Sequence, residues 1–213
     1  MQGHITSAGV FIFEALSIYG NGPPYFLGFA IMLNWYNRGR AFYYIAFLSA
    51  VGYLMNITKM AYHEPRPFMV NSDIKVYGCT AEYGNPSGHS FFASAGHFFI
   101  FLDVCHTKKS PKFSTALYSI LLFLTVSLSF LVGFARFYVG VHTINQIVYG
   151  WSLGIFTAFY FHICLRDTII KHVDKYLLSR KHNDSINYIK NITINSIVAA
   201  ILFGSQIATY FIA

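Results

Sequence analysis

The chain is poor in charged residues, since only 11% of its 213 residues are Asp, Glu, Lys or Arg, against roughly 25% in ordinary soluble domains. So few charges cannot cover the surface of a water-soluble fold. Apolar and aromatic residues take the place of the missing charges, and that composition excludes a disordered chain, a coiled coil and a basic nucleic-acid binder. The three cysteines, Cys79, Cys105 and Cys164, are too few and too scattered for a disulfide framework or a cysteine-based metal site.

Apolar and aromatic residues make up the excess. Hydrophobic residues are 55% of the chain, and 22 Phe and 16 Tyr are among them. The net charge of +7 must therefore lie in loops, while the remaining surface faces lipid. We expect one integral membrane domain over residues 1–213, which associates with membrane lipid and not with nucleic acid.

Several apolar stretches approach the length of about 20 residues that a helix needs to cross a bilayer. Five are credible spans: 41–58, 88–105, 114–135, 144–165 and 192–213. Residues 24–36 are apolar but short, and residues 7–20 contain Glu14, so whether the latter cross the membrane or lie along it stays open. The sequence predicts an all-α fold, a multi-pass membrane helical bundle of six or seven helices.

The positive charges alternate between the two sides of these spans. One side carries most of the 15 Lys and Arg residues: Arg38, Arg40, Lys108, Lys109, Lys112, Arg166, Lys171, Lys175, Arg180, Lys181 and Lys190. The positive-inside rule makes that side cytoplasmic. We therefore expect the loops 59–87 and 136–142 to lie together on the lumenal or external face, and the basic run 166–190 to be a solvated cytoplasmic loop.

Three polar motifs lie at helix ends on that lumenal or external face. Residues 59–67 read Lys-Met-Ala-Tyr-His-Glu-Pro-Arg-Pro, residues 85–90 read Asn-Pro-Ser-Gly-His-Ser, and residues 135–146 read Ala-Arg-Phe-Tyr-Val-Gly-Val-His-Thr-Ile-Asn-Gln. Since each motif closes or opens a predicted helix, all three can meet at the membrane interface.

The motifs contain the residue types that bind a phosphate group. Lys59, Arg66 and Arg136 supply three cations, and an Arg side chain can donate to two phosphate oxygens at once. Ser87 and Gly88 lie at a predicted helix start, where free backbone N–H groups bind anions.

Two histidines complete the set. His89 and His142 are candidates for a proton donor and for a nucleophile or base. Gln146 lies four residues after His142, on the same helical face. Its amide oxygen is placed to accept the Nδ1 proton of His142 and to leave Nε2 free to attack phosphorus.

Taken jointly, Lys-x6-Arg-Pro, Pro-Ser-Gly-His and Arg-x5-His resemble the motifs of the type 2 phosphatidic acid phosphatase (lipid phosphate phosphatase) superfamily. The third motif looks closest to the dolichyl-diphosphatase and glucose-6-phosphatase branches. Most members carry Ser where this chain has Ala135, and Asp where it has Gln146. The two branches also look to carry Gln at that second position, so we interpret Gln146 as a feature of the branch.

The resemblance implies a role for each motif residue. His142 is the expected nucleophile, which forms a phosphohistidine, and His89 is expected to protonate the leaving group and then activate water. The resemblance also implies a phosphate site without metal or cofactor, and residence in the endoplasmic reticulum. The residues expected to hold the phosphate are Lys59, Arg66, Ser87, Gly88 and Arg136.

Each feature alone has a purely structural explanation: Lys59 can snorkel to head groups, for example, and Ser87 can cap a helix. Their joint occurrence in order favours a metal-independent membrane phosphatase for a lipid phosphate or polyprenyl diphosphate, acting at the lumenal or external face. Two alternatives stay open, a glucose-6-phosphatase-like sugar phosphatase and a non-enzymatic membrane subunit that retains the fold. A homo-oligomer or a larger membrane assembly is also open.

Overall fold

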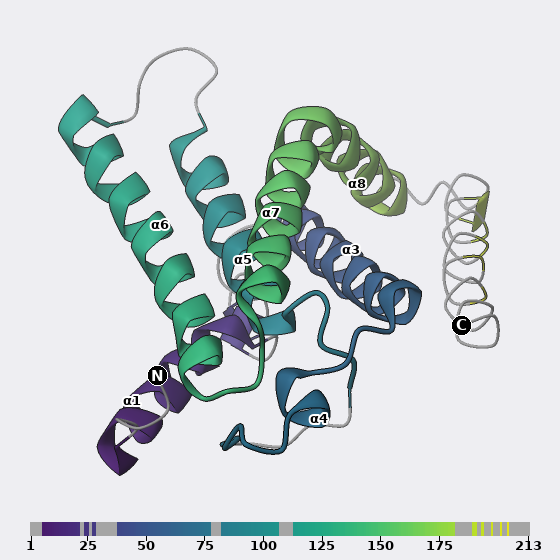
Figure 1. Cartoon of the computed structure of the whole chain (residues 1–213). Helices are drawn as coiled ribbons and strands as arrows, with labels where there is room; N and C mark the ends of the chain where they lie inside the picture. The colour runs from purple at the N-terminus through teal and green to yellow at the C-terminus, as the bar shows by residue number, and fades with distance from the viewer. Residues whose placement is uncertain are drawn as a thin grey trace.

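The computed structural model describes residues 6–21, 24–25, 27–28, 38–77, 82–106 and 113–181, together with 189–190, 193, 197, 201 and 204. All regular structure within this part is helical, which confirms the predicted all-α class (Figure 1). The α-helices are α1 (Ser7–Ser17), α3 (Arg38–Tyr62), α4 (Pro67–Val70), α5 (Gly88–Cys105), α6 (Thr115–Tyr138), α7 (Ile144–Tyr160) and α8 (Arg166–Lys181).

Three helical segments are long and apolar enough to cross a membrane: Gly39–Val70, Thr115–Tyr138 and Ile144–Lys175. They contain three of the predicted spans, 41–58, 144–165 and all but the first residue of 114–135. The predicted span 88–105 forms α5 with the expected bounds, but α5 is not among the three. Most of 24–36 and of 192–213 lies outside the described residues, so the predicted total of six or seven helices is not confirmed.

Helix α5 lies at the centre of the bundle, between α6 and α7 (Figure 1). Small residues such as Ala93, Ser94 and Ala95 are buried along it, which allows its neighbours to approach closely. On α7, a Cβ atom added to Gly150 would lie 2.8 Å from the carbonyl oxygen of Ser87. The first half of α7 is thereby packed directly against the start of α5.

A cluster of aromatic rings joins α3 to α5. Phe47 and Phe99 stack with their ring centroids 3.7 Å apart, and Tyr43 and Tyr44 contact the same Phe99 ring. Phe161, just after α7, packs edge-on against Phe47. Aromatic pairs of this kind stabilise by about 0.5–1.5 kcal/mol each beyond their buried area, and here they hold three helices in register.

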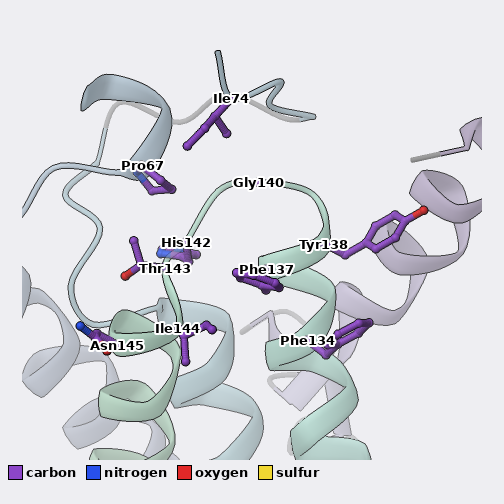
Figure 2. Close-up of a pocket in the computed structure, with 10 residues that line it drawn as sticks. All are labelled: Pro67, Ile74, Phe134, Phe137, Tyr138, Gly140, His142, Thr143, Ile144 and Asn145. Carbon is purple, nitrogen blue, oxygen red and sulfur yellow. The ribbon is translucent and has the colours of Figure 1, made fainter. Parts of the chain in front are cut away.

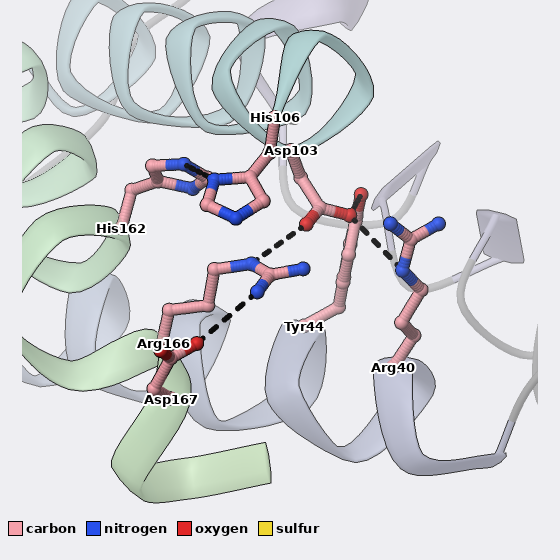
Figure 3. Close-up of polar contacts among 7 residues, drawn as sticks. All are labelled: Arg40, Tyr44, Asp103, His106, His162, Arg166 and Asp167. Carbon is pink, nitrogen blue, oxygen red and sulfur yellow. Dashed lines mark hydrogen bonds and ion pairs between the residues drawn. The ribbon is translucent and has the colours of Figure 1, made fainter. Parts of the chain in front are cut away.

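Residues 166–181 correct one prediction, because they form helix α8 and not a solvated loop. A π-helical turn, Phe161–Leu165, continues α7 into α8 without a break in helical structure. Arg166, at the start of α8, pairs with the buried Asp103 at 3.3 Å. Asp103 also pairs with Arg40 at 3.6 Å and accepts a hydrogen bond of 2.8 Å from Tyr44 (Figure 3). Charged side chains that the sequence places in solvent therefore form contacts that join α3, α5 and α8.

The Asp103 cluster and the three motifs occupy opposite ends of the helices. Arg40 lies near the start of α3 and Asp103 near the end of α5, whereas Lys59 lies in the last turn of α3 and Gly88 opens α5. The α6–α7 connection also lies at the end where α5 begins, since the backbone N–H of Ser87 donates to the Gln146 carbonyl near the start of α7. The fold therefore gathers the motifs at one end of the bundle.

Candidate active site

The first motif is shaped by the end of α3. Lys59 is buried in the last turn, and α3 ends at Tyr62. His63 follows with a φ of 46°, a left-handed conformation that turns the chain sharply out of the helix. The turn brings Arg66 back to the bundle, where it is only 3% exposed.

The second motif places a helix start beside Lys59. Ser87 is fully buried at the N-cap position of α5, yet its side chain makes no capping hydrogen bond. Its hydroxyl oxygen instead accepts from Ser90 at 3.0 Å. A Cβ atom added to Gly88 would lie 3.8 Å from the Lys59 ammonium nitrogen. The Ser87 hydroxyl hydrogen and the first N–H groups of α5 thus lie near a cation, ready to bind an anion.

The third motif contributes a buried cation from the last turn of α6. Arg136 Nη1 donates to the hydroxyl of Ser17 on α1 at 3.4 Å. Its Nε is buried and has no hydrogen-bond partner among the described residues. Because a buried donor without a partner costs free energy, this N–H is a strong candidate to bind an anionic ligand.

The orientation of His142 is set by Gln146. The Gln146 amide oxygen accepts the backbone N–H of Thr143 at 3.2 Å, and its amide nitrogen donates to the Pro65 carbonyl at 3.0 Å. These two contacts turn the oxygen toward the imidazole, where it lies 3.1 Å from His142 Nδ1. Since the oxygen can only accept, Nδ1 carries the proton and Nε2 keeps its lone pair.

The unprotonated nitrogen of His142, Nε2, lies next to the cation Arg66. Nε2 lies 3.3 Å from Nη1 of Arg66, and the side chain is 2% exposed. Burial, followed by the charge of Arg66, holds the pKa of His142 well below its ordinary value. The imidazole is therefore neutral at physiological pH, which is the state that a nucleophile requires.

A pH titration should show this directly. A free histidine is half protonated near pH 6.5, whereas His142 should stay neutral, with its proton on Nδ1, when the pH falls through 6.5. The measurement is ¹⁵N NMR of histidine-labelled protein in detergent, with His142→Ala to assign the signal. A His142 signal that titrates at or above pH 6.5 would contradict the buried, neutral state.

His89 is the second residue of α5 and is partly exposed. The charges that act on it most strongly are those of Arg136, Lys59 and Arg66. Ser87 joins the same group through its backbone N–H, which donates to the Gln146 carbonyl at 3.0 Å. The structure thus brings together all the predicted site residues, while their individual catalytic roles stay predictions.

Two acidic residues of the site were not assigned a role from the sequence. The Glu82 carboxylate accepts a hydrogen bond from Lys59, and its carbonyl accepts from Arg66 Nε at 2.8 Å. The Lys59 contact holds the pKa of Glu82 below its ordinary value. Glu64 Oε1 accepts from the Gln146 amide at 3.1 Å. The available signal was their position, since Glu64 lies inside the first motif and Glu82 lies shortly before the second.

A cavity of about 650 Å³ opens beside His142. Figure 2 shows its walls: the last turns of α6, the turn that carries His142 with the start of α7, and residues of the first loop. The backbone N–H of Tyr77 donates to the Val139 carbonyl at 3.2 Å and ties that loop to the turn. The lining residues are Pro67, Ile74, Phe134, Phe137, Tyr138, Gly140, His142, Thr143, Ile144 and Asn145. The pocket is therefore mainly apolar, with the imidazole at its edge.

A helical bundle that gathers three cations around a buried, oriented histidine at one end has the architecture of a membrane phosphatase. The profile of the PAP2 superfamily matches residues 40–170, a range that contains all three motifs. The chain belongs to the PAP2 superfamily and is an integral membrane protein.

Two relatives illustrate the family. The chain is 31% identical over 155 residues to dolichyldiphosphatase of Saccharomyces cerevisiae, an alignment that spans 70% of this chain and 62% of that protein. The crystal structure of a transmembrane PAP2 type phosphatidylglycerolphosphate phosphatase from Bacillus subtilis superposes with a TM-score of 0.58 at 19% identity, over 81% of this chain and 79% of that one. The second likeness shows a shared fold.

Proposed function

We propose that the protein is a metal-independent membrane phosphatase that hydrolyses a lipid phosphate or a polyprenyl diphosphate through a phosphohistidine at His142. The observation that carries this proposal is the imidazole itself, which is buried and neutral, with Nδ1 held by Gln146 and Nε2 facing Arg66 at 3.3 Å. Similarity to yeast dolichyldiphosphatase supports the same class of substrate.

In this mechanism the cations bind the phosphoryl oxygens that surround the attacked phosphorus. Lys59 and Arg66 lie close together, because both pair with the Glu82 carboxylate. Arg136 has a buried Nε–H donor that makes no hydrogen bond to any described residue. The Ser87 hydroxyl and the Gly88 N–H complete the phosphate site. Donors arranged in advance around developing charge act most strongly in a buried site of low dielectric.

The covalent step uses the lone pair on His142 Nε2. It forms a bond to phosphorus while the bond from phosphorus to the leaving oxygen breaks, and the electron pair of that bond leaves with the oxygen. His89 donates a proton to that oxygen and then takes one from water, which attacks the phosphohistidine and releases inorganic phosphate.

The apolar cavity favours a lipid over a sugar as the substrate. Phe134, Phe137 and Ile144 line the space next to His142 (Figure 2), where a glucose ring would leave its hydroxyl groups without partners. An isoprenoid or acyl chain, by contrast, gains free energy for each apolar group removed from water. With the head group among the cations, the tail would leave toward the bilayer.

The distribution of charge supports one side of the membrane for the site. The end of the bundle that contains the site lies opposite Arg40 and Arg166, on the side that the positive-inside rule assigns to the lumen or exterior. We therefore propose a lumenal site, and residence in the endoplasmic reticulum by likeness to the yeast relative.

The test is phosphate release by purified protein in detergent, with a chelator present and no metal added. The substrates are a polyprenyl diphosphate, phosphatidate, sphingosine phosphate and glucose 6-phosphate. We expect release from at least one lipid and little from glucose 6-phosphate. A preference for glucose 6-phosphate would favour a sugar phosphatase, and no release from any of the four would favour the non-enzymatic subunit.

A further inference from the structure

A line of hydrogen-bonded side chains joins Glu64 to His142. The imidazole N–H at Nδ1 donates to Gln146 Oε1 at 3.1 Å, and the amide nitrogen of Gln146 donates to Glu64 Oε1 at 3.1 Å. Gln146 is fully buried, so its amide has no competing contact with bulk water. The neutral side chain at position 146 is thus hydrogen-bonded to His142 at its oxygen and to a carboxylate at its nitrogen.

Glu64 is itself held in place by the second motif. Its other carboxylate oxygen accepts from Asn85 Nδ2 at 2.7 Å, and its carbonyl accepts the Gly84 N–H at 2.7 Å. A Cβ atom added to Gly84 would lie 2.5 Å from Gln146 Nε2, so a larger residue there would displace the amide from its present position. Glu64, Gln146 and the loop before α5 therefore form one fitted unit.

We propose that Glu64 is a positioning residue that supplies, through the amide of Gln146, the negative charge that stabilises His142 during phosphoryl transfer; this rests on the proposed function. When Nε2 bonds to phosphorus, the imidazole ring becomes positively charged. The carboxylate polarises the amide, which places more negative charge on the oxygen that faces Nδ1–H. Such polarisation along a hydrogen-bonded line is strengthened in a low dielectric. The proton stays on Nδ1 throughout.

The proposal explains why a glutamine is compatible with catalysis at position 146. An Asp at 146 would bring the charge to the imidazole directly. In this chain, however, Gln146→Asp alone would place a second carboxylate against Glu64 and the Pro65 carbonyl, where like charges disfavour ionisation. Moving the charge from residue 64 to residue 146 removes that conflict, which makes a charge swap the informative test.

The experiment compares Glu64→Gln, Gln146→Asp and the double variant with wild type, using the preferred substrate of the panel. Since a hydrogen bond to a charged group is at stake, Glu64→Gln should lower kcat by about 10- to 100-fold. KM should change little, because the Glu64 carboxylate bonds to Gln146 and Asn85, which are not among the residues proposed to bind phosphate. Gln146→Asp alone should also lower kcat. The double variant should recover most of the loss. Asp73→Asn, which removes an exposed acid from the same face, should match wild type.

A second readout does not depend on turnover. The ¹⁵N and ¹H signals of the His142 Nδ1–H group should move in Glu64→Gln and stay in place in Asp73→Asn. The proposal is wrong if Glu64→Gln matches wild type in kcat and in this signal, or if the folded double variant is no more active than Glu64→Gln. A wild-type protein that releases no phosphate would overturn the proposed function, while the NMR comparison would still decide whether Glu64 acts on His142.

Discussion

Replacing His142 by alanine should abolish phosphate release and the covalent intermediate, with kcat lowered by about 10⁴-fold or more, as for other enzymes that lose their nucleophile. The neighbouring side chains cannot take over, because Arg66 is a cation and Gln146 is an amide. This substitution removes the ring nitrogen that lies 3.3 Å from Arg66 and that carries no proton, since Gln146 holds the proton on Nδ1.

The measurement is rapid quench with ³²P-labelled substrate, followed by a test of whether the label on the protein is lost in acid and kept in base. Wild type should show the label and His142→Ala should not. His172→Ala, which removes an exposed histidine of α8, is the matched control. Near-wild-type turnover by His142→Ala would exclude the covalent mechanism.

Replacing His89 by alanine should produce the second largest loss, and its size should depend on the leaving group. General acid–base catalysis contributes about 10²- to 10⁴-fold. The leaving group of phosphatidate is an alkoxide, which needs a proton. The leaving group of a polyprenyl diphosphate is a polyprenyl phosphate, which departs more easily without one. We expect the loss in kcat to be larger for phosphatidate.

The control for His89 lies on the same helix. His97, two turns further along α5, contacts Ser129 at 3.1 Å, away from the motifs. His97→Ala should therefore lower kcat equally for both substrates or leave it unchanged. An equal loss for both substrates in His89→Ala would mean that His89 shapes the site without donating the proton.

The helices show how far apolar length alone predicts this fold. Residues 88–105 form α5 with the predicted bounds, whereas α3 runs beyond the predicted 41–58 to Arg38–Tyr62. Hydropathy marks the part of a helix that lies in lipid, and α3 continues past it at both ends. Low hydropathy likewise predicts a loop for the basic stretch after residue 165. The structure has a helix there, α8, and its first residue, Arg166, pairs with Asp103.

The site shows a similar division. The contact between His142 and Gln146 was predicted from a spacing of four residues on one helix. The contact is present, but His142 lies before Thr143, the N-cap of α7, and Gln146 reaches back to it from the capping box at the helix start. The contacts of Glu64 and Glu82 depend on the left-handed His63 and on how the loop before α5 folds back. Those conformations arise from packing between segments that are distant in the sequence. A single sequence therefore does not predict them directly.

The sequence by itself determined the all-α class, the membrane character and the three motifs that the fold brings to one end of the bundle, because apolar length, charge distribution and residue spacing act locally along the chain. Only the tertiary structure decided that α5 is the central helix, that an apolar cavity lies beside His142 and that Glu64 stands behind Gln146. These features depend on small side chains that let helices approach and on loops that turn back over them. They are properties of the assembled bundle, since each needs two or more segments in contact before it exists.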